Sequence, residues 1–163
     1  MIGYKFLGTG GVAPFSSFAW PTGSPGPWVE AEPHVCESGI HACRPGDLPF
    51  WINAELWEIE LDGAVDGTRK VVARRGRLLR RIEAWDRTVA SEFGESCFAA
   101  VDELGTMTDF ASDARELVAA GDVAGASFVA ARAAETAAGT SAYEAERQRQ
   151  AAWLVDRLEL AHA

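Results

Sequence analysis

Histidine and cysteine side chains gather in one short segment, residues 34–43, in the pattern His-x-Cys-x4-His-x-Cys. Thiolate and imidazole groups are preferred zinc ligands, and four of them can close a tetrahedral site. Two ligands separated by one residue share a face of an extended chain, but they lack the turn of a zinc knuckle. The spacing therefore favours Cys36 and Cys43 as small buried side chains and His34 as a solvated one. Zinc binding through Cys36, His41 and Cys43 is the weaker alternative.

His41 is the candidate catalytic residue of this segment. Gly39 precedes it and allows close approach of a ligand to the backbone. An imidazole at the end of a strand can act as an acid, a base or a hydrogen-bond donor near neutral pH. No Ser, Asp or second His stands at a recognisable catalytic spacing, so a structural histidine bonded to a loop carbonyl is the competing interpretation, and the spacing slightly favours it.

Aromatic residues are concentrated around a proline-rich stretch, residues 14–33, which predicts an exposed loop. The aromatic set consists of Trp20, Trp28, Phe50, Trp51 and Trp57. Such rings can wall a pocket that stacks a planar ligand, or they can anchor the loop on the core, which is the commoner role. The glycine run at residues 8–11 lacks the spacing of a phosphate-binding loop.

Arginine dominates residues 69–87, which hold more than half of the 15 Lys and Arg residues of the chain. The run consists of Arg69, Lys70, Arg74, Arg75, Arg77, Arg80, Arg81 and Arg87. A patch of this density could receive a phosphate or an acidic partner. The favoured alternative is that these side chains form cross-strand pairs with Glu58 and Glu60 and ion pairs with the acidic helices.

The elements that position these residues divide the chain into two halves. All seven prolines lie between Pro14 and Pro49, and alanine is enriched in the second half, so we expect strands and loops over 1–85 and helices over 86–163. Because no long linker separates the halves, we expect them to pack as one unit. The fold class predicted is α+β: a small, mainly antiparallel sheet packed with a C-terminal bundle of about four helices.

Hydrophobic periodicity places individual elements. Alternation and turn residues predict strands over 2–7, 56–62, 70–73 and 77–82, with another strand ending at His41. Asp47 is expected to cap a short helix that runs through Trp51. The later helices are expected to begin with Asp86, Thr108, Asp122 and a Ser141/Glu144 capping box. In the second of these helices Phe110, Ala114, Leu117 and Val118 are expected to face inward, and Cys97 is expected in the core on the apolar stripe of the first.

Charge and composition exclude some functions. The formal net charge is -9, so broad nucleic-acid binding is disfavoured. No apolar stretch is long enough to span a bilayer and no export leader is visible, so we expect no membrane association. Three cysteines fit a reducing cytoplasm better than a disulfide-stapled secreted fold.

Residues 36–43, Cys-Glu-Ser-Gly-Ile-His-Ala-Cys, resemble the C-x-x-G-[FI]-H-A-C signature of a family of uncharacterised bacterial and phage domains. The resemblance extends over about residues 1–82 and includes Tyr4-Lys5-Phe6, Asp47, Trp51, the strand at 56–63 and Lys70–Ala73. That family carries no function that could be transferred to this chain.

The order of elements is also distantly similar to the ADP-ribosyltransferase fold. Under that similarity, Gly39-Ile40-His41 takes the place of the strand and tyrosine that stack on nicotinamide, and NAD is the implied cofactor. His41 then replaces an aromatic hydroxyl, and Tyr4-Lys5 stands where that fold has a His-Gly pair. No catalytic glutamate can be assigned.

These observations lead to one functional hypothesis and one alternative. We expect a pocket near His41 that takes a nucleotide-like or planar anionic small molecule and transfers ADP-ribose from NAD. His41 is the catalytic candidate, and the substrate-binding candidates are Tyr4, Lys5, Arg44 and Trp51. The alternative is a non-catalytic module that binds a protein partner through the arginine-rich strands or the helical half.

Overall fold

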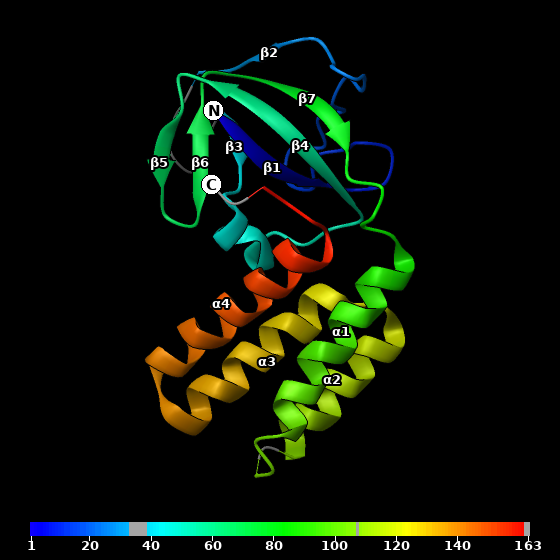
Figure 1. The fold of residues 1–163 in the computed structure, drawn as a ribbon, viewed down its shortest axis with the longest axis vertical. Helices are drawn as coiled ribbons and strands as arrows, with labels where there is room; N and C mark the ends of the chain where they lie inside the picture. The colour runs from blue at the N-terminus through cyan, green and yellow to red at the C-terminus, as the bar shows by residue number, and fades with distance from the viewer. Residues whose placement is uncertain (33–38, 107, 162–163) are drawn as a thin grey trace. The chain divides into compact units, whose positions relative to one another are not determined.

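The chain divides into a strand-rich part and a helical part, as a computed structural model shows for residues 1–32, 39–106 and 108–161 (Figure 1). One compact unit, the strand unit, consists of Met1–Trp85 with the C-terminal residues from Ala161. The other, the helical unit, consists of Asp86–Leu160. The predicted α+β class is confirmed, and the boundary expected after residue 85 coincides with the junction of the units.

The strand unit contains two antiparallel sheets. The first has four strands in the order β1 (Ile2–Leu7), β4 (Glu55–Asp62), β7 (Arg75–Arg81), β2 (Val29–Glu30). The second has three strands in the order β3 (Ile40–Ala42), β6 (Lys70–Ala73), β5 (Val65–Gly67). An isolated bridge between Tyr4 and Cys43 links β1 to the end of β3. The short strands β2 and β5 were not predicted, and β2 interrupts the expected loop over 14–33.

The alternation predicted for β4 is present. Trp57, Ile59 and Leu61 are buried, while the intervening Glu58 and Glu60 remain partly exposed. These two glutamates face arginines of β7 across the strand pair. Apolar burial on one face and opposite charges on the other explain why this sequence forms a central strand.

Residues of both sheets share one hydrophobic core. Its buried members are Leu7, Trp20, Ile40, Ala42, Trp57, Ile59, Leu61, Val71, Ala73 and Leu78. Gly76 of β7 allows the sheets to approach closely, because a Cβ at this position would lie 2.6 Å from Ile40 Cγ2. Trp20 anchors the β1–β2 loop in this core, as one of the two interpretations of the loop tryptophans predicts.

The helical unit has four helices, of which α3 packs against each of the others (Figure 1). They are α1 (Arg87–Asp102), α2 (Thr108–Ala120), α3 (Val123–Ala138) and α4 (Thr140–Arg157). The predicted caps of α1 and α3 are confirmed. Asp86 Oδ1 accepts a hydrogen bond from Val89 N at 2.9 Å, and Asp122 Oδ1 accepts one from Gly125 N at 2.8 Å. Each cap satisfies a backbone donor that the helix itself leaves open.

Two local expectations are wrong. The 3₁₀ helix at Pro45–Phe50 begins before Asp47, whose carboxylate instead accepts a hydrogen bond from Arg44 Nε at 2.7 Å. Helix α4 begins at Thr140 with Gly139 at its cap position, so Ser141 does not cap it. Phe128 of α3 is 53% exposed. Within the described ranges, no helix is long and apolar enough to cross a membrane.

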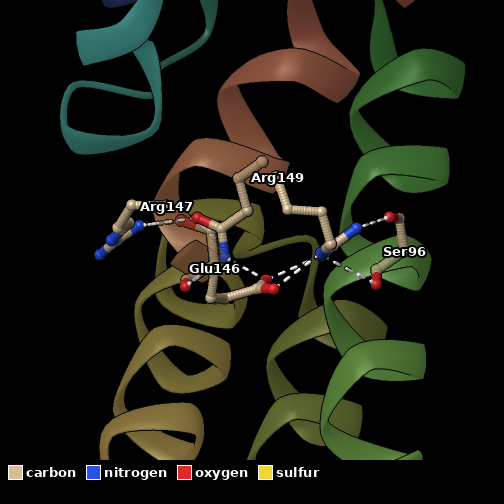
Figure 2. Close-up of polar contacts among 6 residues, drawn as sticks. Ser96, Glu146, Arg147 and Arg149 are labelled. Atoms are coloured by element: carbon tan, nitrogen blue, oxygen red, sulfur yellow. Dashed lines mark hydrogen bonds and ion pairs between the residues drawn. The ribbon is translucent and has the colours of Figure 1, made fainter. Parts of the chain in front are cut away.

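The buried face of α4 is partly polar. Glu146, Arg147 and Gln150 are buried there. Glu146 accepts hydrogen bonds from Arg149, which also donates to Ser96 of α1 (Figure 2). Gln150 Nε2 donates to Glu146 Oε1 at 2.8 Å and to Ser127 O at 3.0 Å. Arg147 Nη1 donates to Ser127 Oγ and to Gln150 Oε1, each at 3.0 Å. This network fixes α4 against α3 through directional bonds rather than through apolar packing alone.

Candidate functional site

A cavity of about 800 Å³ opens in the strand unit. Its walls come from β1, β2, β3, the loop between β1 and β2, and residues 50–53 at the end of the 3₁₀ helix. This volume is within the range of pockets that bind small molecules and cofactors.

Aromatic rings form much of the cavity wall. The lining rings are Phe6, Phe15, Phe18, Trp20, Phe50 and Trp51. Phe18 meets Trp20 edge to face at a centroid distance of 5.7 Å, and Phe15 meets Trp51 edge to face at 6.4 Å. Trp20 is buried, whereas Phe15 is 88% exposed. The rings therefore extend from the core to the solvent and offer faces on which a planar ligand can stack.

The side chains of the 3₁₀ helix end are held in place by neighbouring groups. Trp51 Nε1 donates a hydrogen bond of 2.6 Å to Arg69 O, and the Arg69 guanidinium lies 4.3 Å from the centroid of the Phe50 ring. These contacts orient both rings before any ligand binds. A wall that is already ordered costs less conformational entropy on binding.

Lys5 brings a primary amine to the cavity wall. Its Nζ donates a hydrogen bond of 2.6 Å to His41 O and lies 5.0 Å from the centroid of Trp20. Removal from water lowers the pKa of Lys5 to about 8. Neighbouring Cys43 provides no counterion near neutral pH, because burial raises the pKa of its thiol to about 12.

A second amine, that of Lys70, also lines the cavity. Lys70 Nζ lies 5.8 Å from the centroid of Trp51. Among the described lining residues the one carboxylate is Glu30, and it forms an ion pair with Arg75 at 3.0 Å. The lining side chains are therefore cationic on balance, although the whole chain is acidic.

The structure brings three of the five predicted site residues together. His41, Lys5 and Trp51 all line the cavity. Among the described lining residues, Tyr4 and Arg44 are absent. The predictions that these two contact a ligand there are therefore not supported by the geometry.

The positions of Tyr4 and Arg44 have clear physical causes. Tyr4 neighbours Lys5 in β1, and successive side chains of a strand point to opposite faces. Its hydroxyl accepts a hydrogen bond from Ala161 N at 3.1 Å. The Arg44 guanidinium is engaged by the carboxylates of Asp47 at 2.7 Å and Asp66 at 2.9 Å.

Sequence reasoning missed Phe15, Phe18 and Lys70 as cavity residues. Lys70 belongs to the arginine-rich run, and the predicted aromatic set contains neither phenylalanine. A usable signal for Lys70 was its rarity, because only two of the 15 basic residues are lysines. No sequence signal distinguishes the two phenylalanines from residues that anchor a loop.

Other candidate sites have structural uses. Gly10 N, in the glycine run, donates to the Glu55 carboxylate at 2.9 Å. The expected cross-strand pairs are confirmed for Arg77 with Glu60 and for Arg80 with Glu58, each at 2.7 Å. These guanidinium groups are thus part of the sheet's own charge pairing.

The cysteine predictions can be assessed in part. Cys43 and Cys97 are buried free thiols, as expected. His34 and Cys36 lie outside the described residues. Within the part of the chain that is described, no cluster of three or more His, Cys, Asp or Glu side chains could hold a metal ion.

Comparison of the chain with family models, curated proteins and solved structures found no match. Function is therefore inferred from the cavity and its residues.

Proposed function

We propose that the strand unit binds a planar anionic small molecule, of nucleotide-like character, in the aromatic cavity. The carrying observation is that aromatic rings and two lysine amines line one cavity of about 800 Å³. Rings stack on a planar group, and ammonium groups attract phosphate or carboxylate oxygens. Neither feature alone specifies a ligand, but together they match a flat ring that carries negative charge.

Lys5 is the group to which we assign anion recognition. It is held by His41 O and the Trp20 ring, and no carboxylate among the described residues forms an ion pair with it. Its lowered pKa reflects the cost of keeping an ammonium in this wall. A bound anion would offset that cost, so ligand binding and protonation of Lys5 should favour each other.

NAD is the first ligand to test, together with ADP-ribose. His41 lines the same cavity as Trp51. We assign the His41 imidazole to the acid–base or hydrogen-bonding step if ADP-ribose is transferred from NAD. If the wild type releases nicotinamide from NAD and His41→Gln does not, the result supports transfer of ADP-ribose. If NAD binds and no nicotinamide is released, the function is limited to binding.

Tryptophan fluorescence and calorimetry test binding directly. Titration with NAD or ADP-ribose should give a saturable fluorescence change that Trp51→Phe reduces and Trp153→Phe, in the helical unit, does not. Lys5→Met should weaken binding by about 10- to 100-fold, the effect of losing a hydrogen bond to a charged group. Absence of any saturable response at millimolar NAD and ADP-ribose would overturn the nucleotide proposal.

The alternative function is docking of a protein partner through the arginine-rich strand β7. The Arg80 side chain is 62% exposed even though it pairs with Glu58. This alternative predicts that Arg80→Glu with Arg81→Glu abolishes partner binding and that His41→Ala leaves it intact. The cavity proposal predicts that the double charge reversal leaves ligand binding intact and that Lys5→Met weakens it.

A further inference from the structure

Lysine is rare in this chain, and both lysines line the aromatic cavity. Lys5 and Lys70 are the two lysines among 15 basic residues, the others being arginines. A guanidinium stays protonated and is not a nucleophile near neutral pH, whereas a lysine amine becomes one when it loses its proton. The cavity therefore collects every side-chain amine that this chain possesses.

Lys5 is held in a way that suits the neutral amine. Its Nζ has the His41 carbonyl at 2.6 Å as a hydrogen-bond acceptor and the Trp20 ring on another side. A neutral amine can donate one N–H to this carbonyl and keep its lone pair for another atom. An ammonium has three N–H groups that each need a hydrogen-bond acceptor or a counterion. In the described part of the chain, no carboxylate forms an ion pair with Lys5.

Burial also raises the share of neutral amine. With the pKa of Lys5 lowered to about 8, about a tenth of the molecules carry the free amine at pH 7, compared with well under a thousandth for an ordinary lysine. Desolvation in an apolar wall is the established way to activate a lysine as a nucleophile. Lys5 thus combines access to a cavity, a fixed position and a usable lone pair.

We propose that Lys5 Nζ forms a reversible imine with an aromatic aldehyde that carries an anionic group and binds in the cavity. This inference rests on the proposed function for the binding of the ring and the anion, and it adds the reactive group of the ligand. For a ligand that carries an aldehyde, the roles of the amines differ from those given above for an anion alone: neutral Lys5 bonds to the carbonyl carbon, and Lys70, beside Trp51, attracts the anionic group in its place.

The proposed step is balanced without an oxidant or reductant. The lone pair of Lys5 Nζ forms a bond to the carbonyl carbon, and the C=O π electrons move to oxygen. A proton passes from nitrogen to that oxygen and gives a carbinolamine. The hydroxyl then leaves as water after gaining a proton, and the nitrogen loses its remaining proton as C=N forms. The net change is amine plus aldehyde to imine plus water.

Pyridoxal 5′-phosphate is a suitable probe, because it is a planar phosphorylated aldehyde. The full chain is incubated with it at pH 7, reduced with sodium borohydride, digested and analysed by mass spectrometry. Lys5 should be labelled at least 10-fold more than Lys70 or the N-terminal amine at substoichiometric probe. Labelling of Lys5 equal to or below that of Lys70 would overturn the proposal.

Matched variants separate the two lysines. Lys5→Arg and Lys70→Arg both keep a positive charge and remove an amine. Lys5→Arg should remove the absorbance of the imine, whereas Lys70→Arg should keep it and require a higher probe concentration. Wild-type chain unfolded in guanidinium should lose the preference for Lys5, which tests the role of the cavity even if a variant folds poorly. A preference that survives unfolding would overturn the proposal.

Pyridoxine 5′-phosphate distinguishes failure of the imine from failure of the binding proposal. It has the same ring and phosphate but an alcohol in place of the aldehyde. Saturable binding of this alcohol without labelling of Lys5 by the aldehyde would overturn the imine and leave the proposed function standing. Labelling of Lys5 that the alcohol suppresses in a dose-dependent way would support both.

Discussion

The buried network on α4 and the cavity amine of Lys5 hold polar groups in different ways. In the helical unit, buried Gln150 and Glu146 bond to each other, and Arg147 and Arg149 bond to them in turn (Figure 2). In the strand unit, the amine of Lys5 bonds to a carbonyl and lies against the Trp20 ring beside a cavity. The side chains around Gln150 supply hydrogen-bond partners to one another, whereas the amine of Lys5 borders a cavity that a ligand can enter.

This difference separates stability from function. A buried network whose donors and acceptors are matched specifies how helices pack, and it has little left to offer a ligand. A desolvated amine beside an open cavity costs stability, and that cost can be offset by a ligand. The strand unit is therefore the place where binding is expected, and the helical unit is the place where polar substitutions should damage the fold.

The largest effect is expected for Gln150→Leu. Gln150 is fully buried, and its loss leaves Ser127 O, Glu146 Oε1 and Arg147 Nη1 each short of a hydrogen-bond partner. We expect the free energy of unfolding of the helical unit to fall by about 2–5 kcal/mol. Chemical denaturation followed by circular dichroism measures this change.

Gln148→Leu is the matched control, because Gln148 is exposed on the same helix. Its effect should stay within about 0.5 kcal/mol. Equal stability of the two leucine variants would show that the buried network does not hold α4, and the comparison between the units would fail.

Much of the fold follows from local sequence signals. Asp86 and Asp122 cap helices because a carboxylate can reach the backbone donors of the next turn, which is a property of a few adjacent residues. The buried face of α4 could not be predicted in this way. Gln150 and Arg147 bond to Ser127, and Arg149, the partner of Glu146, bonds to Ser96, and both serines are far away in the sequence.

The site was predictable to the extent that its residues lie in one segment. His41 and Trp51 were found because rare, chemically capable residue types stand close together. Tyr4 lies outside the described cavity lining because alternation along β1 directs its side chain to the face opposite that of Lys5. Arg44 lies outside it because its guanidinium pairs with Asp47 and with Asp66, and the position of Asp66 depends on the sheet rather than on the local sequence.

A smaller effect is expected from the titration of Lys5. Its folded-state pKa of about 8 lies below the ordinary value of 10.5, so between these pH values the unfolded chain binds more protons than the folded chain. The contribution of Lys5 to the stability of the wild type should therefore rise with pH through this window. Lys5→Met lacks this contribution, so the stability of the wild type relative to it should increase by about 2–3 kcal/mol from pH 8 to pH 10.5.

The comparison with Lys5→Met is needed because titration of Cys43 changes the free energy of unfolding with pH in the opposite direction. The pKa of the Cys43 thiol is raised to about 12, so its contribution to stability is lost as pH rises above the ordinary thiol value of 9. Both proteins contain Cys43, and its effect largely cancels in the difference. A difference that stays constant across the window would show that Lys5 is solvated, which removes the contrast with the helical unit.

The smallest effect is expected for surface ion pairs, one in each unit. Arg80 pairs with Glu58 in the strand unit at 2.7 Å, and Arg157 pairs with Glu92 in the helical unit at 2.9 Å. The arginine side chains are 62% and 45% exposed, so water screens both interactions. Double-mutant cycles with alanine, measured by chemical denaturation, should give coupling energies below about 1 kcal/mol for each pair.

Similar small coupling energies in the two units would show that burial, and not the presence of charge, makes the polar groups around Gln150 and Lys5 differ energetically from exposed ion pairs. A coupling above about 2 kcal/mol at either exposed pair would contradict that explanation.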